Sequence, residues 1–302
     1  MTTRRRFLAI SAAALTLPRA TQAAPLYTWK GVALGAGATI RLAHPDAAEI
    51  AARAAAEISR LEDVFSLYRT DSALSRLNAN GRLDAPPFEL LQCLSLAGAV
   101  HSATDGRFDP TIQPLWAAYA EALGQAPAPK LLAKALAQTG WEKIRLDEMV
   151  ITMEPGMALT LNGIAQGFIA DQVADLLRSE GLRNILIDTG EFAALGGQPD
   201  GGAWPVKLAT GGTVALENRA LASSAPLGTT FDSAGTLSHI LDPRSGLPAV
   251  ARWRGVSISA RSAALADALT TAACLASDKA EIVGFVQAFA GAKLESAERS
   301  AT

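Results

Sequence analysis

The sequence predicts an α+β protein, a single compact domain of mixed sheets packed with helices and built from two intimate subdomains. Three observations support this class. Short segments with β-type alternation outnumber those that simple strand–helix–strand crossovers require, so a doubly wound sheet is not expected. The chain has 302 residues, 49% of them hydrophobic, which is enough for one large core. No segment has the composition of a linker between separate domains.

The first half of the chain is expected to form a strand pair followed by three helices. Residues 30–42 read as two short strands interrupted by glycine. The first helix begins with Asp46 and Glu49, the pattern of a capping box. From helical spacing and from proline and glycine at the ends, the three helices are expected over residues 46–68, 87–106 and 129–139.

The second half alternates more often between strands and helices. Turn residues separate short apolar segments here, and an alanine-rich segment lies near the C-terminus. The expected elements are strands around Ile144, Ile151 and Leu159, a helix over 167–180, a strand over 184–188, a hairpin at Trp204, and helices over 262–276 and up to about residue 290.

The first 24 residues have the pattern of a cleaved export signal. Arginines precede a short apolar run, and small residues around Ala23 provide a cleavage site. The pair Arg4 and Arg5 favours a twin-arginine signal, although an ordinary secretory signal with a spare arginine is the alternative. The run is shorter than the roughly 20 apolar residues that span a bilayer. We therefore expect a mature domain of residues 25–302 in the periplasm.

The charge argues against binding of nucleic acid, and the cysteine content excludes a cysteine-rich metal site. Removal of the leader deletes four arginines and no acids, so the formal net charge changes from −2 to −6, with 23 basic and 29 acidic residues. Such a domain is not expected to bind nucleic acid, and an anionic ligand would need a metal ion and backbone N–H groups. Cys93 and Cys274 are the only cysteines, which excludes a cysteine-rich metal site. They could pair in an oxidising compartment or remain buried free thiols.

Two segments in the first half place polar residues where a ligand could bind. Residues 66–78 put Tyr68 at the end of a helix, where its ring could stack on a planar ligand, but Asp71 could equally cap the next turn of an ordinary helix terminus. Residues 105–115 place Asp109 beside a rigid proline, next to a glycine that permits close backbone approach. The structural alternative is a helix-to-loop turn.

Two further segments suit phosphate and metal. Residues 161–171 lead from a strand through small residues into a helix, whose N–H groups suit a phosphate, although this glycine spacing is common. Asp267 and Thr271 are four residues apart on a predicted helix, so their oxygens share one face. Hard oxygen donors of this kind suit Mg²⁺. A partly buried Asp–Thr hydrogen bond is the alternative.

Three histidines are present, and only one lies in a typical catalytic position. His44 is expected on a surface loop, and His101 is expected to have a structural role in a helix. His239 ends a strand-like segment before a proline- and glycine-containing turn. With a reference pKa near ~6.5, it could accept a hydroxyl proton at neutral pH.

Taken in order, these segments resemble the ApbE family of flavin transferases. That family shows Tyr-x-x-Asp-Ser-x-Leu-x-x-x-Asn, then Gly-x-Phe-Asp-x-Thr, a glycine-rich strand-to-helix turn, His-x-x-Asp-Pro-x-x-Gly and Ala-Asp-x-x-x-Thr. All five occur here in that order, between about residues 30 and 285, with Trp204 at the family's hairpin tryptophan. The resemblance thus covers nearly the whole mature chain and implies an ApbE-like fold.

The resemblance implies a reaction and a metal site. The family transfers FMN from FAD to a Ser or Thr hydroxyl of an acceptor protein in a Mg²⁺-dependent reaction that releases AMP. His239 matches the residue proposed as its catalytic base. Mg²⁺ would be bound by Asp267, Thr271 and the backbone carbonyl of Gly163, with Thr270 close by.

The resemblance also implies contacts with FAD, some of them altered here. This chain departs from the family at Ala36, Thr160 and Gln166, and Gly190-Glu191 stands where two glycines are usual. The metal residues show no such departure. With Tyr68 stacked on the flavin, the implied FAD contacts are Leu34, Gly35, Ala36, Tyr68, Arg107, Phe108, Asp109, Thr160, Gln166 and Leu241.

The departures leave the acceptor and two other functions open. Together with the string Gly31–Ala36 and the leader, they resemble the branch that serves nitrous oxide reductase maturation, whose acceptor would be a membrane flavoprotein. The same departures would fit a periplasmic FAD-binding or carrier protein without chemistry. A metal-dependent FAD hydrolase, with water as the acceptor, is the other alternative. The retained His239 favours catalysis, because a carrier needs no base.

Overall fold

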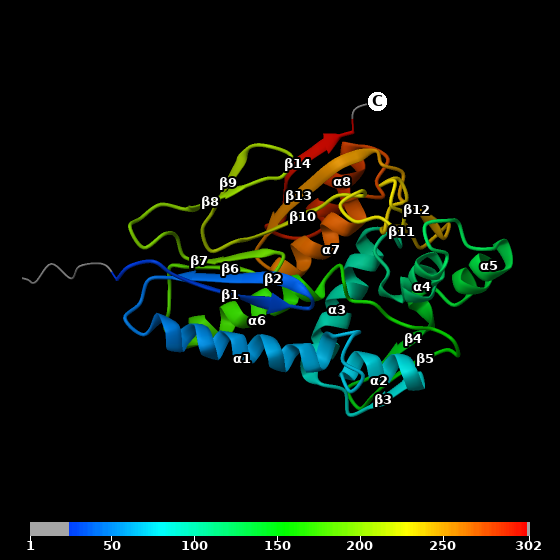
Figure 1. Ribbon diagram of the computed structural model, residues 1–302, viewed down its shortest axis with the longest axis horizontal. Helices are drawn as coiled ribbons and strands as arrows, with labels where there is room; N and C mark the ends of the chain where they lie inside the picture. Colours follow the sequence, from blue (N-terminus) through cyan, green and yellow to red (C-terminus); the bar gives the residue numbers. More distant parts are fainter. Residues whose placement is uncertain (1–23, 301–302) are drawn as a thin grey trace, which may run out of the picture.

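A seven-stranded antiparallel sheet forms the centre of the protein, as the computed structural model, which describes residues 24–300, shows (Figure 1). Of the neighbouring strands in this sheet, β2 and β6 are the farthest apart in sequence, and their pairing connects the N-terminal hairpin to the middle of the chain. In spatial order its strands are β1 (Tyr27–Ala33), β2 (Ala36–Leu42), β6 (Ile185–Asp188), β7 (Phe192–Leu195), β10 (Ala220–Ser224), β13 (Trp253–Ala260) and β14 (Lys293–Arg299).

Helices with one apolar face cover this sheet. The helix α1 (Ala47–Phe65) buries residues at helical spacing from Ile50 to Phe65 and lies along α6 (Ala165–Ser179). The helix α7 (Ala263–Ala273) packs on β10 and β13 and also contacts α6. Apolar residues recurring every three or four positions explain why these segments form helices and which faces they bury. The main core therefore lies between the sheet and these three helices.

Smaller elements gather beyond one end of the large sheet (Figure 1). They include a three-stranded sheet in the order β3-β5-β4, and two-stranded hairpins form elsewhere in the chain. The elements outside the large sheet and its three helices are α2 (Ala73–Asn80), β3 (Arg82–Asp84), α3 (Phe88–Ala103), η1 (Pro110–Ile112), α4 (Gln113–Glu121), α5 (Pro129–Ala137), η2 (Trp141–Lys143), β4 (Ile144–Leu146), β5 (Val150–Met153), β8 (Trp204–Lys207), β9 (Thr213–Leu216), β11 (Leu241–Asp242), β12 (Leu247–Pro248) and α8 (Lys279–Gln287), of which β8 and β9 lie on the other side of the sheet.

The predicted α+β class is confirmed, but several local predictions are wrong. The capping box does not form, because the Asp46 side chain accepts no hydrogen bond from the helix, and its N–H instead donates to His44 Nδ1 at 3.1 Å. Leu159 is not in a strand, since the Asn78 side chain exchanges two hydrogen bonds with its backbone, at 2.7 and 2.8 Å. The residue that caps α2 is Ser72, which accepts from Ser75 N–H at 3.0 Å.

Two helices end earlier than predicted. The second ends at Ala103, because Asp105 and Gly106 adopt left-handed backbone conformations with φ of 51° and 71°. The alanine-rich helix ends at Ala273. Both cysteines are buried free thiols, and burial raises the pKa of each. Within residues 24–300 no helix combines the length and hydrophobicity needed to cross a membrane.

Candidate active site

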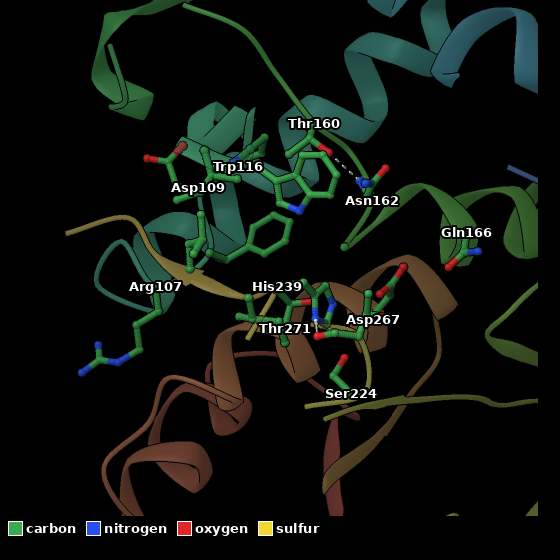
Figure 2. Close-up of a pocket in the computed structure, with 18 of the residues that line it drawn as sticks. Arg107, Asp109, Trp116, Thr160, Asn162, Gln166, Ser224, His239, Asp267 and Thr271 are labelled. Carbon is green, nitrogen blue, oxygen red and sulfur yellow. Dashed lines mark hydrogen bonds between the residues drawn. The ribbon is translucent and has the colours of Figure 1, made fainter. Parts of the chain in front are cut away.

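A cavity of about 400 Å³ opens between α7, the start of α6 and the segment before α4 (Figure 2). Most of the residues that the sequence singled out meet here, although they are spread over more than 160 positions of the chain. Those that line the cavity are Arg107, Phe108, Asp109, Thr160, Gly163, Gln166, His239, Leu241, Asp267 and Thr271.

Close contact between α6 and α7 creates the side of the cavity where Asp267 lies. Gly167 permits it, because a Cβ atom there would lie 2.4 Å from the carbonyl oxygen of Ala263. Asp171 of α6 accepts the N–H groups of Ala263 and Ala264 at 2.7 and 3.0 Å and so caps α7. The two helix starts are thereby fixed relative to each other.

Asp267 lies at this helix contact with most of its hydrogen-bonding capacity unused. It is 3% exposed, and the one hydrogen bond to its carboxylate comes from Gly167 N–H to Oδ2, at 3.3 Å. Burial raises the pKa of Asp267 to about 7, and the charge of Asp171 acts in the same direction. A buried carboxylate with one long hydrogen bond fits a cation, which would offset the cost of its ionisation.

Neutral oxygens lie beside this carboxylate. Thr271 is one turn further along α7, and a Cβ at Gly163 would lie 2.8 Å from its Oγ1, so the backbone at residue 163 packs directly against the hydroxyl. No group of three or more His, Cys, Asp or Glu side chains among the described residues could hold a metal. One carboxylate with hydroxyl and carbonyl oxygens is a hard donor set that fits Mg²⁺.

Thr270 takes no place in the cavity lining. Its side chain is fully buried, donates to the Asp267 carbonyl oxygen at 2.8 Å and accepts from Ser224 Oγ at 2.9 Å. Ser224 itself lines the cavity. Thr270 therefore lies behind the residues that line the cavity, where its side chain connects α7 to β10 through the hydrogen bond with Ser224.

The orientation of His239 leaves one ring nitrogen free. Its Nδ1 lies 2.7 Å from the carbonyl oxygen of Thr229, and a carbonyl only accepts, so Nδ1 carries the proton in the neutral ring. The Nε2 atom is then an acceptor beside the cavity (Figure 2). Burial lowers the pKa of His239, although contacts with the Thr229 and Pro226 carbonyls oppose this. The ring is therefore neutral at pH 7 and able to take a proton.

Arg107 and Asp109 border the cavity but direct their charged ends away from it (Figure 2). The Arg107 guanidinium pairs with Glu281 of α8. Asp109 accepts from the N–H of Thr111 at 2.8 Å and of Trp141 at 3.2 Å, which are structural contacts. Burial raises the pKa of Asp109 despite these hydrogen bonds. Both side chains thus support the wall without offering charge to a ligand.

The structure places four predicted FAD contacts outside the cavity lining. Leu34 and Gly35, with φ of 49° and 83°, make the tight turn between β1 and β2 next to Ala36. The Leu34 N–H donates to Glu62 Oε1 at 2.8 Å, which attaches this turn to the end of α1. Tyr68 follows α1 and is 79% exposed. The turn and the tyrosine therefore flank the same helix end.

Gln166 and its neighbours form the start of α6. The Ala165 N–H donates to the Leu161 carbonyl at 2.8 Å and the Gly167 N–H donates to Asp267, so this helix start would favour an anion mainly through the positive end of its dipole. The side-chain amide of Gln166 lies under Gly190, where a Cβ would approach it to 3.0 Å. Gly190 has φ of 104°, which also favours glycine. Thr160 lies two residues before Asn162 and accepts the N–H of that residue at 3.3 Å.

Sequence reasoning missed part of the wall. Glu191 is 7% exposed, and the hydrogen bond to its carboxylate comes from Ser223 N–H at 3.2 Å. Burial and the charge of Asp267 raise the pKa of Glu191 well above its ordinary value. Its departure from the glycine usual in the family was the signal that could have marked it. The missed lining residues include Trp116, Asn162, Glu191, Ser223 and Ser224.

Comparison with known proteins identifies the family. Residues 34–291 match the model of the ApbE family. The chain is 31% identical over 243 residues to a FAD:protein FMN transferase of Klebsiella pneumoniae, covering 74% of each chain, and 30% identical over 237 residues to one of Haemophilus influenzae, covering 70% of this chain and 68% of the relative.

Solved structures agree with this match. The chain superimposes on the apo flavinyl transferase ApbE of Pseudomonas stutzeri with a TM-score of 0.78 and 24% identity, covering 87% of this chain and 89% of the other. For the ApbE protein of Thermotoga maritima the TM-score is 0.80 at 25% identity, with 91% and 97% covered. The resemblance seen in the motifs is confirmed, and the chain belongs to the ApbE family.

Proposed function

We propose that the protein transfers the FMN moiety of FAD to a Ser or Thr hydroxyl of an acceptor protein and releases AMP. The observation that carries this proposal is the meeting of two kinds of group in one cavity. Asp267 offers a buried carboxylate with one long hydrogen bond, and His239 offers a free Nε2. The relatives named as FAD:protein FMN transferases support the same activity.

The cation side of the cavity would bind the diphosphate of FAD. Asp267, Thr271 and the carbonyl of Gly163 would hold Mg²⁺, because hard oxygens converge there. When bound, the ion neutralises charge on the phosphate oxygens and orients them. The positive end of the α6 dipole would also favour an anion here. Phe108, Trp116 and Leu241 supply apolar surface that suits an aromatic ring of FAD.

His239 would act as the general base. The acceptor hydroxyl gives its proton to Nε2 while its oxygen forms a bond to the FMN phosphorus. The bond from that phosphorus to the bridging oxygen breaks, and AMP leaves with the electron pair. The hydrogen bond from Nδ1 to the Thr229 carbonyl stabilises the imidazolium that forms. Positioning and electrostatic stabilisation supply most of the catalysis in transfers of this kind.

The compartment and the acceptor are parts of the proposal that come from the sequence. The leader, residues 1–24, falls almost entirely outside the described residues, and it supports export to the periplasm by a twin-arginine route. The string Gly31–Ala36 supports an acceptor of the nitrous oxide reduction system, a membrane flavoprotein. The β1–β2 turn and Tyr68 would contact FAD from outside the cavity lining, with the exposed Tyr68 ring stacked on the flavin.

One assay tests the activity. The protein is incubated with FAD, Mg²⁺ and a candidate acceptor, and flavin fluorescence on the denatured acceptor is measured together with AMP. We expect flavinylated acceptor and one AMP per flavin transferred. Free FMN with AMP and an unmodified acceptor would instead identify a hydrolase, and unchanged FAD would identify a carrier.

Two histidine variants make the assay specific. In His239→Asn, an amide group replaces the Nδ1–H donor but cannot accept the proton, so transfer should fall by about 10²–10⁴-fold. His44→Asn is the matched control, because His44 lies outside the cavity and contacts Asp46 N–H. Equal rates for both variants and the wild type would reject His239 as the base.

A further inference from the structure

The catalytic histidine stands at the end of a loop that folds back on itself. This histidine loop, residues 225–240, connects β10 to β11. The N–H of His239 donates to the Thr229 carbonyl at 3.2 Å, and the same carbonyl lies 2.7 Å from the ring Nδ1. Thr230 and Ser238 form an isolated antiparallel bridge. The carbonyl that sets the tautomer of His239 therefore depends on the position of the loop.

An aromatic side chain attaches the histidine loop to α4. The Phe231 ring stacks on Tyr119, with centroids 5.5 Å apart and an interplanar angle of 23°. It also meets Trp116 edge-on, at 5.4 Å and 61°. Tyr119 is 1% exposed, so this contact is part of a buried cluster. Phe231 is two residues from Thr229 in the sequence. Its contacts with α4 therefore lie close to the carbonyl that orients His239.

The same tyrosine fixes the chain on the other side of His239. The Tyr119 hydroxyl donates to the carbonyl oxygen of Gly246 at 3.1 Å, in the turn between β11 and β12. One side chain of α4 thus contacts the segment before the histidine, through Phe231, and the segment after it, through Gly246. Trp116, one turn earlier on α4, contacts Phe231 and also lines the cavity.

We propose that Phe231 and Tyr119 are positioning residues that hold His239 with Nδ1 on the Thr229 carbonyl and Nε2 toward the cavity. The inference rests on the proposed role of His239 as base. Without the ring of Phe231, the histidine loop keeps Leu237 against the cluster around α4 but loses its aromatic contacts there, and the imidazole can rotate or exchange its proton between the two nitrogens. Because misplacement of a reacting group by about 1 Å can cost about 10²-fold in rate, the anchor controls turnover without contacting substrate.

The first test measures the ring itself. Protein labelled with ¹⁵N-histidine is studied by NMR at pH 8, where the His239 ring is neutral, and the His239 signals are identified by their loss in His239→Asn. We expect a protonated Nδ1 and an unprotonated Nε2 in the wild type. Phe231→Leu should show a mixture of both tautomers. This comparison needs no activity, so it decides the positioning even if the transferase assay fails.

The second test separates turnover from binding. Phe231→Leu, and Tyr119→Phe, which removes only the hydroxyl, should lower kcat by about 10–100-fold while KM for FAD and Mg²⁺ affinity change less than twofold. Phe88→Ala is the control, because Phe88 is an exposed phenylalanine outside the cavity. Phe231→Tyr keeps the ring and should restore most of the rate. Wild-type kcat and an unchanged tautomer in both test variants would overturn the proposal, and so would equal losses of kcat and Mg²⁺ affinity.

Discussion

The charge on Asp267 should destabilise the metal-free protein, and Asp267→Asn should remove that effect. Desolvation raises the pKa of this buried carboxyl from 3.8 to about 7. A folded-state pKa above the unfolded one means that the contribution to stability is complete below about pH 4 and is lost as pH rises through about 7. The rise in pKa corresponds to about 4 kcal/mol of unfolding free energy lost by pH 8.

The variant carries a neutral amide of the same shape, so its stability should depend less on pH. In EDTA, Asp267→Asn should match the wild type at pH 4 and exceed its unfolding free energy by up to about 4 kcal/mol at pH 8. Glu191 acts in the same direction, because its pKa is raised by burial and by Asp267. The single variant should therefore retain some slope, and adding Glu191→Gln to Asp267→Asn should reduce that slope further.

The assay is urea unfolding, followed by tryptophan fluorescence at both pH values. In EDTA the linear extrapolation yields the two free energies. With Mg²⁺ and FAD present the order should reverse, because a ligand that binds only the folded state stabilises the wild type and not the variant. A wild type that is equally stable at pH 4 and pH 8 in EDTA would refute the reasoning. So would an Asp267→Asn protein that is weaker than the wild type at pH 8.

Three other changes test the remaining site and the leader. Gly163→Ala places a Cβ 2.8 Å from Thr271 Oγ1, so Mg²⁺ affinity, measured by calorimetry on the FAD-bound protein, should fall about 10–100-fold; an unaltered affinity would place the metal elsewhere. Tyr68→Ala should weaken FAD binding roughly 2- to 10-fold, the value of one aromatic stack, in a flavin-fluorescence titration; no change would exclude stacking. Replacing Arg4 and Arg5 with Lys should leave the precursor in the cytoplasm in cell fractionation, whereas normal export would indicate the general secretory route.

The sequence predicted those parts of the site that depend on local geometry. Asp267 and Thr271 share a face because they are four residues apart on a helix, and that spacing alone placed both on one side of α7. The segment 161–171 was recognisable as a turn of small residues that leads into a helix, whereas the roles of Gly163 and Gln166 were implied by the resemblance to the family. The α+β class followed in the same way from the alternation of short periodic segments.

The rest depended on contacts between distant parts of the chain. Arg107 and Asp109 have the charge of ligand-binding residues, but Glu281, 174 positions away, and the Trp141 N–H, 32 positions away, take up their polar ends. Leu159 alternates with its neighbours like a strand residue, and the side chain of Asn78 uses its backbone groups instead. Which hydrogen-bond partner a side chain or backbone group finds is decided by tertiary packing. The local periodicity of the sequence therefore does not reveal it.

The direct contact of α6 with α7 has a consequence for how acceptor preference can change. Gly167 leaves no side chain between the helices, and each helix supplies the other with a carboxylate, Asp171 in one direction and Asp267 in the other. Any substitution that separates them moves Asp267, Thr271 and the start of α6 at once. The histidine loop has no such double constraint, since Phe231 and Leu237 attach it to the cluster around α4 by side-chain packing. New acceptor sequences should therefore be accommodated by changing the loop, with the two helices left as an unchanging frame.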